Sequence, residues 1–387
     1  AGKPNYFARA AVLLARGLHN MIDRRIVSIF LPHFAMERWE RVMERAGARP
    51  PSDVPVVLVH EGAHGQVIYR AARLAGIASG ARVVDMRAIC PELRVDYADI
   101  AGDRVALNRL SLWARRWCPW TVTDGENGLI LDTTGADHLA GGEVAMLAEM
   151  EARLAVSGLT PQLAIAPTWG AAWALARYGT VRAICHYEQI AETLAPLSAA
   201  ALRLDGATLL LLRRLGLKTI GALADVPRLS MARRFARHAL ERNPMLRLDQ
   251  AMGRLAEPVA SVEERPWIIA QVRLPEPIQD PTAYLPDLCA SLCAQLIAEG
   301  KGCRRLSLTV YRTDGEVSTL TAATAAPSRD AKHLRSLFDD KLDKINPGFG
   351  FDLITLEAVL IEPLQIVQHR LDGAGEDEVE LTQLIDR

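Results

Sequence analysis

The stretch Ile130-Leu131-Asp132-Thr133-Thr134-Gly135 has the pattern of a strand that ends inside a protein core. Apolar residues lead to a single aspartate, and two threonines and a glycine then close the strand. Just upstream, Asp124-Gly125 and Asn127-Gly128 supply turn residues, so residues 122–131 are predicted to form a β-hairpin. We expect Asp132 to be structural, bonding near the turn that follows the strand.

Composition sets broad limits on the kind of protein. The chain has 387 residues, enough for two to four compact units, and 50% of them are hydrophobic. Lys plus Arg (45) nearly balances Asp plus Glu (46), so any surface for nucleic acid must be local. No apolar run reaches the ~18 residues of a membrane span, and we expect a cytoplasmic protein. Six cysteines without a CxxC pair predict reduced core thiols, and the scattered histidines predict no metal site.

Hydrophobic patterning divides the chain into regions. The first 195 residues alternate between strands, expected at 25–31, 54–60 and 162–166, and helices, expected at 36–47, 67–75, 104–117, 142–157 and 170–178. This alternation indicates an α/β or α+β domain. Residues 196–258 are helical and rich in Leu and Arg, and the proline-containing stretch 259–280 is predicted to be a linker or strand entry. From 281 onward the pattern is α-β-β-α-β, followed by a polar tail.

Four segments, in order along the chain, resemble motifs of the Y-family (translesion) DNA polymerases. Residues 74–80 followed by Pro91 resemble the fingers motif, and Pro119 lies thirteen residues before Asp132, as in that family. Residues 163–167 (LAIAP) resemble a palm motif, and residues 215–223 (LGLKTIGAL) resemble the helix-hairpin-helix of the thumb. The resemblance covers roughly residues 25–365.

The resemblance implies an α+β, multidomain right hand of palm, fingers, thumb and little finger. It assigns the palm to 25–58 and 99–195, the fingers to 59–98 and the thumb to 196–258. The linker is then 259–280 and the little finger 281–365, with an N-terminal extension at 1–24 and a polar tail at 366–387.

The departures from the family affect the metal-binding carboxylates. The family's catalytic carboxylates align with Phe30, Pro32, Asn127 and Gly128, none of which supplies a carboxylate. Catalysis by two magnesium ions needs hard oxygen ligands, so no metal and no cofactor are expected. This loss resembles the ImuB group, polymerase-like proteins of bacterial mutagenic repair. A shifted register that makes Asp124 or Glu126 the true ligand stays open as an alternative.

Binding residues are predicted mainly from local basic density. In the fingers, Arg70 and Arg73 would lie three apart on a helix and contact phosphate, or else form a solvated face. In the thumb, the hairpin would hold DNA phosphate through its turn N–H groups and through Arg213, Arg214, Gly216, Lys218 and Gly221. The little finger would contribute Arg304, Arg305 and Arg312, and Gln368 with Leu371 has the shape of a sliding-clamp motif.

The resemblance therefore implies a non-catalytic, DNA-binding and scaffolding subunit of error-prone translesion synthesis during the DNA damage response, located in the cytoplasm at the nucleoid. Its expected partners are damaged primer-template DNA, an error-prone C-family DNA polymerase, a RecA-like accessory protein and the sliding clamp, with no membrane. Two alternatives remain: an active Y-family polymerase with relocated ligands, and a helix-hairpin-helix protein unrelated to replication.

Overall fold

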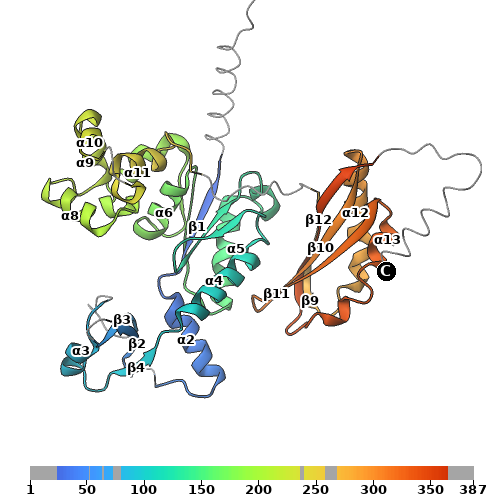
Figure 1. Ribbon diagram of the computed structural model, residues 1–387, viewed down its shortest axis with the longest axis horizontal. Coiled ribbons are helices and arrows are strands. Elements are labelled where there is room, and N and C mark those ends of the chain that lie inside the picture. The colour runs from blue at the N-terminus through green and yellow to red at the C-terminus, as the bar shows by residue number, and fades with distance from the viewer. Residues whose placement is uncertain are drawn as a thin grey trace, which may run out of the picture. The chain divides into compact units, whose positions relative to one another are not determined.

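The computed structural model describes residues 24–51, 53–62, 65–72, 80–235, 239–257 and 268–364. The chain divides into two compact units, Ala1–Ala260 and Ser261–Arg387. Figure 1 shows mixed sheets and helices in the first unit and one sheet with helices in the second.

A five-stranded sheet with the order β5-β6-β1-β7-β8 forms the centre of the first unit. Its middle strand β1 (Ile26–Phe30) pairs antiparallel with β6 (Gly128–Asp132) on one side and with β7 (Gln162–Ala166) on the other. β5 (Thr121–Thr123) and β6 form the hairpin predicted from the sequence, and β8 (Ala183–Ile184) closes the far edge.

Helices pack on this sheet. α6 (Trp169–Tyr178) is rich in alanine, and its buried Ala171, Ala172 and Ala174 share a core with Ile26 and Ile130. Because side chains alternate along strands, Phe30 and Gly128 face the same side as Ile26 and Ile130, toward α6. The other helices of this region are α2 (Phe34–Arg45), α4 (Ile100–Ala114) and α5 (Glu143–Val156).

A separate three-stranded sheet has the order β3-β2-β4. It contains β2 (Val56–Gly62), β3 (Gly65–Ala72) and β4 (Arg94–Tyr97), with the short helix α3 (Val83–Ile89). Two expectations were wrong here. The predicted helix at 67–75 is a strand as far as Ala72, because Val67, Ile68 and Tyr69 favour a pleated, half-buried surface. The predicted palm strand, now β2, pairs with β3 and β4 and so belongs to this sheet.

The region predicted to be helical, 196–258, is helical over its described residues, and one further helix, α7 (Ile190–Leu194), comes just before it. The region contains α8 (Gly206–Arg214), α9 (Ile220–Ala224), α10 (Arg228–Phe235) and α11 (Pro244–Ala251). Side-chain caps begin three of them: Asp205 accepts from the Thr208 N–H at 2.7 Å, and Thr219 and Asn243 do the same for α9 and α11.

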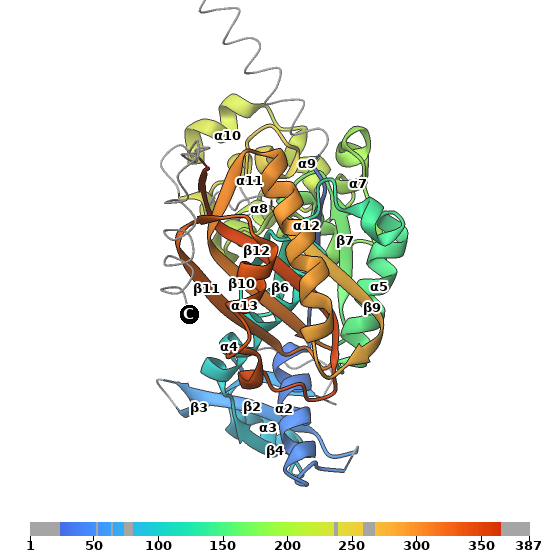
Figure 2. The same cartoon turned by 90° about the vertical axis from the view of Figure 1, so that its right-hand side faces the viewer.

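The second unit is an antiparallel sheet with the order β11-β10-β12-β9, and α12 (Leu285–Ala298) covers one face (Figure 2). Its strands are β9 (Ile269–Ile278), β10 (Lys301–Arg312), β11 (Val317–Ser328) and β12 (Phe351–Pro363). The helix between β11 and β12 is α13 (Ala331–Ser336). Residues 259–280 were predicted to be a linker or a strand entry, and the linker assignment is wrong over 269–278, which form a strand. Its Pro275 and Pro277 are compatible with a strand because β9 lies at the edge of the sheet.

Short 3-10 helices complete the described chain, at Asp137–Ala140, Tyr187–Gln189, Ala199–Leu202, Leu240–Arg242, Thr282–Tyr284 and Leu342–Lys344.

Candidate functional site

The four positions that the resemblance aligns with catalytic carboxylates come together at one end of β1. Phe30 lies directly opposite Gly128 in the β1–β6 register. The Leu31 N–H donates to the carbonyl oxygen of Asn127 at 2.8 Å, and Pro32 follows next in the chain. The structure therefore gathers Phe30, Pro32, Asn127 and Gly128 in one small region.

An arginine from α6 fills the space beside these residues. The Arg177 guanidinium carbon lies 4.3 Å from the centre of the Phe30 ring and 4.1 Å from that of the Trp173 ring. Its Nη2 also pairs with Asp124 Oδ2 at 3.2 Å. A side chain at position 128 would collide with this arrangement, because a Cβ there would lie 3.0 Å from Arg177 Nη2 and 2.8 Å from the Asp124 carbonyl oxygen.

Arg177 and Asp124 are largely removed from water, with side chains 10% and 15% exposed. Burial lowers the pKa of the Arg177 guanidinium to about 10, although the Asp124 carboxylate opposes this shift. The group therefore stays positive at neutral pH. Both rings and the carboxylate stabilise that charge, because aromatic faces attract cations.

A two-magnesium centre does not fit these residues. Phe30, Pro32 and Gly128 offer no side-chain oxygen, and Asp124 is already paired with a cation. A divalent ion would also be repelled by the guanidinium. Across the part of the chain that the structure describes, no three His, Cys, Asp or Glu side chains are grouped as a metal site requires.

The other acidic residue of the β5–β6 turn, Glu126, is also engaged. Its Oε2 accepts from the Tyr69 hydroxyl and from Arg70 Nη2, both at 3.0 Å. Arg70 thus lies on strand β3 rather than on a helix, and it contacts a carboxylate of the chain itself. Burial, and then the hydrogen bond to Glu126, raise the pKa of the Tyr69 phenol to about 12. Arg73 lies outside the described residues.

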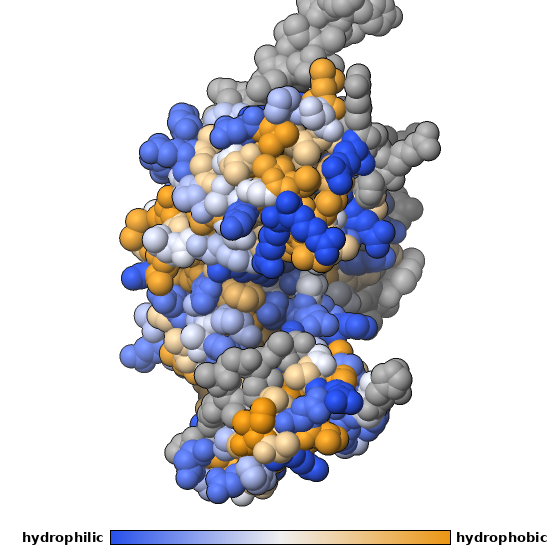
Figure 3. All heavy atoms as spheres, turned by 90° about the vertical axis from the view of Figure 1, so that its left-hand side faces the viewer, coloured by the Kyte–Doolittle hydropathy of each residue, from blue (hydrophilic) through white to orange (hydrophobic). Residues whose placement is uncertain are grey.

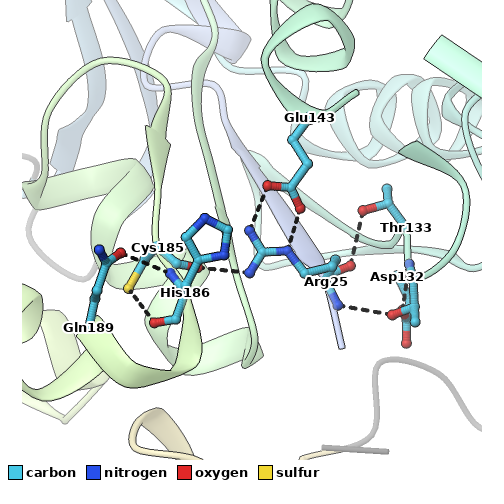
Figure 4. Close-up of polar contacts among 8 residues, drawn as sticks. Arg25, Asp132, Thr133, Glu143, Cys185, His186 and Gln189 are labelled. Carbon is cyan, nitrogen blue, oxygen red and sulfur yellow. Dashed lines mark hydrogen bonds and ion pairs between the residues drawn. The ribbon is translucent and has the colours of Figure 1, made fainter. Parts of the chain in front are cut away.

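The opposite end of β1 carries a structural network (Figure 4). Arg25 forms a two-pronged ion pair with Glu143 at the start of α5 and donates to the Cys185 carbonyl at 2.8 Å. Asp132 pairs with Arg24 at 2.7 Å and accepts from the Thr134 hydroxyl. Asp132 therefore fastens the end of β6, in keeping with the structural role that the sequence suggests.

The expected helix-hairpin-helix is formed by α8 and α9. Gly216 in its turn has φ +79°, which favours glycine, and a Cβ at Gly221 would lie 3.1 Å from Ala195. The backbone N–H groups of residues 216–218 and 220–221 already donate to carbonyls of the protein at 2.9–3.1 Å. The turn's N–H groups predicted to hold phosphate are thus used internally, so any contact with phosphate would fall to side chains.

Those side chains are available. Arg213, Arg214 and Lys218 are exposed around the hairpin. In Figure 3, the surface over this helical region shows hydrophilic side chains gathered around hydrophobic ones. The hairpin therefore presents a local cationic surface.

The basic residues of the second unit differ in their availability. Arg305 is exposed on β10. Arg304 donates to the Thr324 carbonyl and lies 3.6 Å from Glu362, whereas Arg312 is 13% exposed and paired with Asp314. Arg305 is thus better placed than Arg312 to reach a ligand. The proposed clamp residues Gln368 and Leu371 lie outside the described residues.

Sequence reasoning missed Arg177 and the Tyr69–Glu126 contact. The sequence did carry a signal for the contact between Arg177 and Trp173, because these two residues are four apart and share one face of a helix. It also missed a buried group in which Glu257 pairs with both Arg203 and Arg247.

Comparison with solved structures identifies the fold. A Y-family DNA polymerase chimera, Dbh-Dpo4(243-245)-Dbh, is 13% identical with a TM-score of 0.51, covering 87% of this chain and 99% of that chain. DinB from Sulfolobus solfataricus is also 13% identical, with a TM-score of 0.50 over the same shares. The fold is that of a Y-family DNA polymerase, so the sheets and helices above are those of its right hand.

Sequence comparison narrows this class. Residues 265–371 match the impB/mucB/samB family C-terminal domain. Protein ImuB of Caulobacter vibrioides, in two strains, is 40% identical over 319 residues, which are 81% of this chain and 68% of that protein. The chain belongs to the ImuB family, related to Y-family polymerases and to mutagenesis after DNA damage. None of the described helices is long and apolar enough to span a membrane.

Proposed function

We propose that this protein is a non-catalytic, DNA-binding and scaffolding subunit of error-prone translesion synthesis. The observation that carries the proposal is the Arg177 guanidinium, held against Phe30 and Gly128 where the polymerase fold would place metal ions. A side-chain cation cannot replace magnesium in nucleotidyl transfer, because it cannot take substrate oxygens as ligands.

The engaged carboxylates support the same conclusion. Asp124 is paired with Arg177, and Glu126 accepts from Tyr69 and Arg70. The alternative of an active polymerase with relocated ligands would require both acids to leave these partners. No observation on the described residues favours that rearrangement.

DNA binding is proposed for the thumb hairpin and the little finger. Arg213, Arg214, Lys218 and Arg305 are exposed and would contact phosphates without reading sequence. The proposed partners are damaged primer-template DNA, a C-family polymerase, a RecA-like protein and the sliding clamp, with a cytoplasmic, nucleoid-associated location.

The catalytic part of the proposal is tested by primer extension with magnesium and with manganese. No extension is expected at protein concentrations that saturate DNA binding. Metal-dependent extension that is lost in Asp124→Asn or Glu126→Gln would instead establish the relocated-ligand polymerase.

The DNA-binding part is tested by the salt dependence of affinity. The triple variant Arg213→Ala, Arg214→Ala, Lys218→Ala should weaken binding and reduce the slope of log K against log salt by about one per lost phosphate contact. A matched control removes three other exposed arginines, Arg45, Arg87 and Arg104, from the same unit. Equal loss in both triple variants would mean that only net charge matters, and an unchanged slope in the hairpin variant would show that the hairpin only packs.

A further inference from the structure

The turn between β5 and β6, residues 124–127, is fastened by three separate elements of the first unit. Asp124 pairs with Arg177 of α6, and Glu126 binds β3 through Tyr69 and Arg70. The Asn127 carbonyl accepts from the N–H of Leu31, just after β1. The turn therefore contacts α6, β3 and the end of β1 at once.

The contact with β3 joins two sheets that share no strand. β3 belongs to the three-stranded fingers sheet, whereas β5 and β6 belong to the palm sheet. Tyr69 and Arg70 donate to the same oxygen of Glu126, and the Arg70 guanidinium also lies 4.2 Å from the centre of the Tyr69 ring. Glu126 is thus a direct polar link between fingers and palm.

A β-bulge makes this double contact possible. Adjacent residues of a regular strand point to opposite faces. In the β2–β3 register, however, Leu58 opposes Arg70 while Val59 opposes Ile68, so Tyr69 is an extra residue. Bulges of this kind redirect a side chain. Here the bulge lets two neighbouring residues converge on one carboxylate.

We propose that the 124–127 turn is a built-in clamp, in which Glu126 docks the fingers on the palm by occupying the Tyr69–Arg70 donor pair in place of a bound phosphate. This inference rests on the proposed non-catalytic function, in which no nucleotide has to reach these donors. Glu126 is 60% exposed and Arg70 28%, so the link is much more accessible to competing anions than the Asp124–Arg177 pair. The contact with Glu126 would therefore hold the fingers when no nucleotide is bound. Once Glu126 is removed, a polyphosphate could reach the Tyr69–Arg70 donors.

Hydrogen–deuterium exchange of the full chain, read by mass spectrometry, tests the clamp. Glu126→Ala should raise exchange of peptides from β3 about fivefold, the factor expected from losing one modest exposed interaction. Peptides from β1 and β7 should not change. The matched control is Asp85→Asn, which breaks the exposed Arg82–Asp85 pair within the fingers.

Added tripolyphosphate extends the test to the donor pair. It should restore protection of β3 in Glu126→Ala and leave the parent protein unchanged. Tyr69→Phe removes one donor only and should give a smaller rise, which keeps the test usable if Glu126→Ala folds poorly. Unchanged β3 exchange in Glu126→Ala, or an equal rise in Asp85→Asn, would overturn the clamp. Neither readout depends on polymerase activity, so a failure here is separate from a failure of the proposed function.

Discussion

Replacing Arg177 by methionine should destabilise the first unit strongly, although it removes a buried charge. Its lowered pKa, about 10, means that keeping Arg177 charged costs roughly 3 kcal/mol relative to water. The variant avoids that cost but leaves Asp124, only 15% exposed, without its cation. Breaking a buried pair by removing one partner costs about 3–5 kcal/mol, so we expect a net loss in that range.

The double variant Arg177→Met, Asp124→Asn separates the pair from the packing. Both charges are gone, and methionine still fills the space between Phe30 and Trp173. The free energy of unfolding of the double variant should lie within about 1.5 kcal/mol of the parent's, because a buried ion pair and a well-packed apolar replacement contribute similar stability. Together with Asp124→Asn alone, these two variants complete a cycle that gives the coupling free energy between the two charges.

Urea unfolding followed by tryptophan fluorescence measures these effects in the full chain. Six of the seven tryptophans report on the first unit: Trp39, Trp113, Trp117, Trp120, Trp169 and Trp173. A single variant as stable as the parent, or a double variant less stable than the single one, would refute the reasoning. Magnesium should not raise the stability of the parent. A bound ion would stabilise the folded state by mass action, and we expect none to bind.

Two further predictions use the same region. Gly128→Ala should cost about 1–3 kcal/mol in the urea assay, because its Cβ would lie 2.8 Å from the Asp124 carbonyl oxygen; a neutral result would show that the turn yields easily. Tyr69 should titrate near its raised pKa of about 12. The parent protein and Tyr69→Phe should therefore have the same tyrosinate absorbance at pH 10.5, and the parent should have more at pH 12.5. A folded-state pKa raised above the ordinary ~10 contributes stability that is present below pH ~10 and lost as the pH rises toward 12; a titration at pH ~10 would contradict the contact with Glu126.

Local patterns in the sequence were enough to find much of the fold. The hairpin before Asp132, the helices of the thumb and the alternation of the first 195 residues each depend on near neighbours, and the structure has them. The absence of carboxylates at Phe30 and Gly128 is also a property of the sequence alone.

In two places the prediction from local sequence was wrong because strand pairing decided the structure. Residues 67–72 have both helical spacing and β-branched side chains, and pairing with β2 decided for the strand. Residues 269–278 contain prolines that suggest a linker, but pairing with β12 makes them an edge strand. In both cases the deciding hydrogen bonds come from residues distant in the sequence.

Which group lies beside Phe30 and Gly128 was decided only by tertiary structure. Nothing near Arg177 in the chain indicates that it meets Asp124 or Phe30. It does so because the alanine face of α6 packs on the side of the sheet that carries Phe30 and Gly128. Because glycine at position 128 leaves room beside the Phe30 ring, a guanidinium from that helix can enter, pair with Asp124 and stay charged. The sequence shows that positions 30 and 128 carry no carboxylate, and packing determines which group lies beside them.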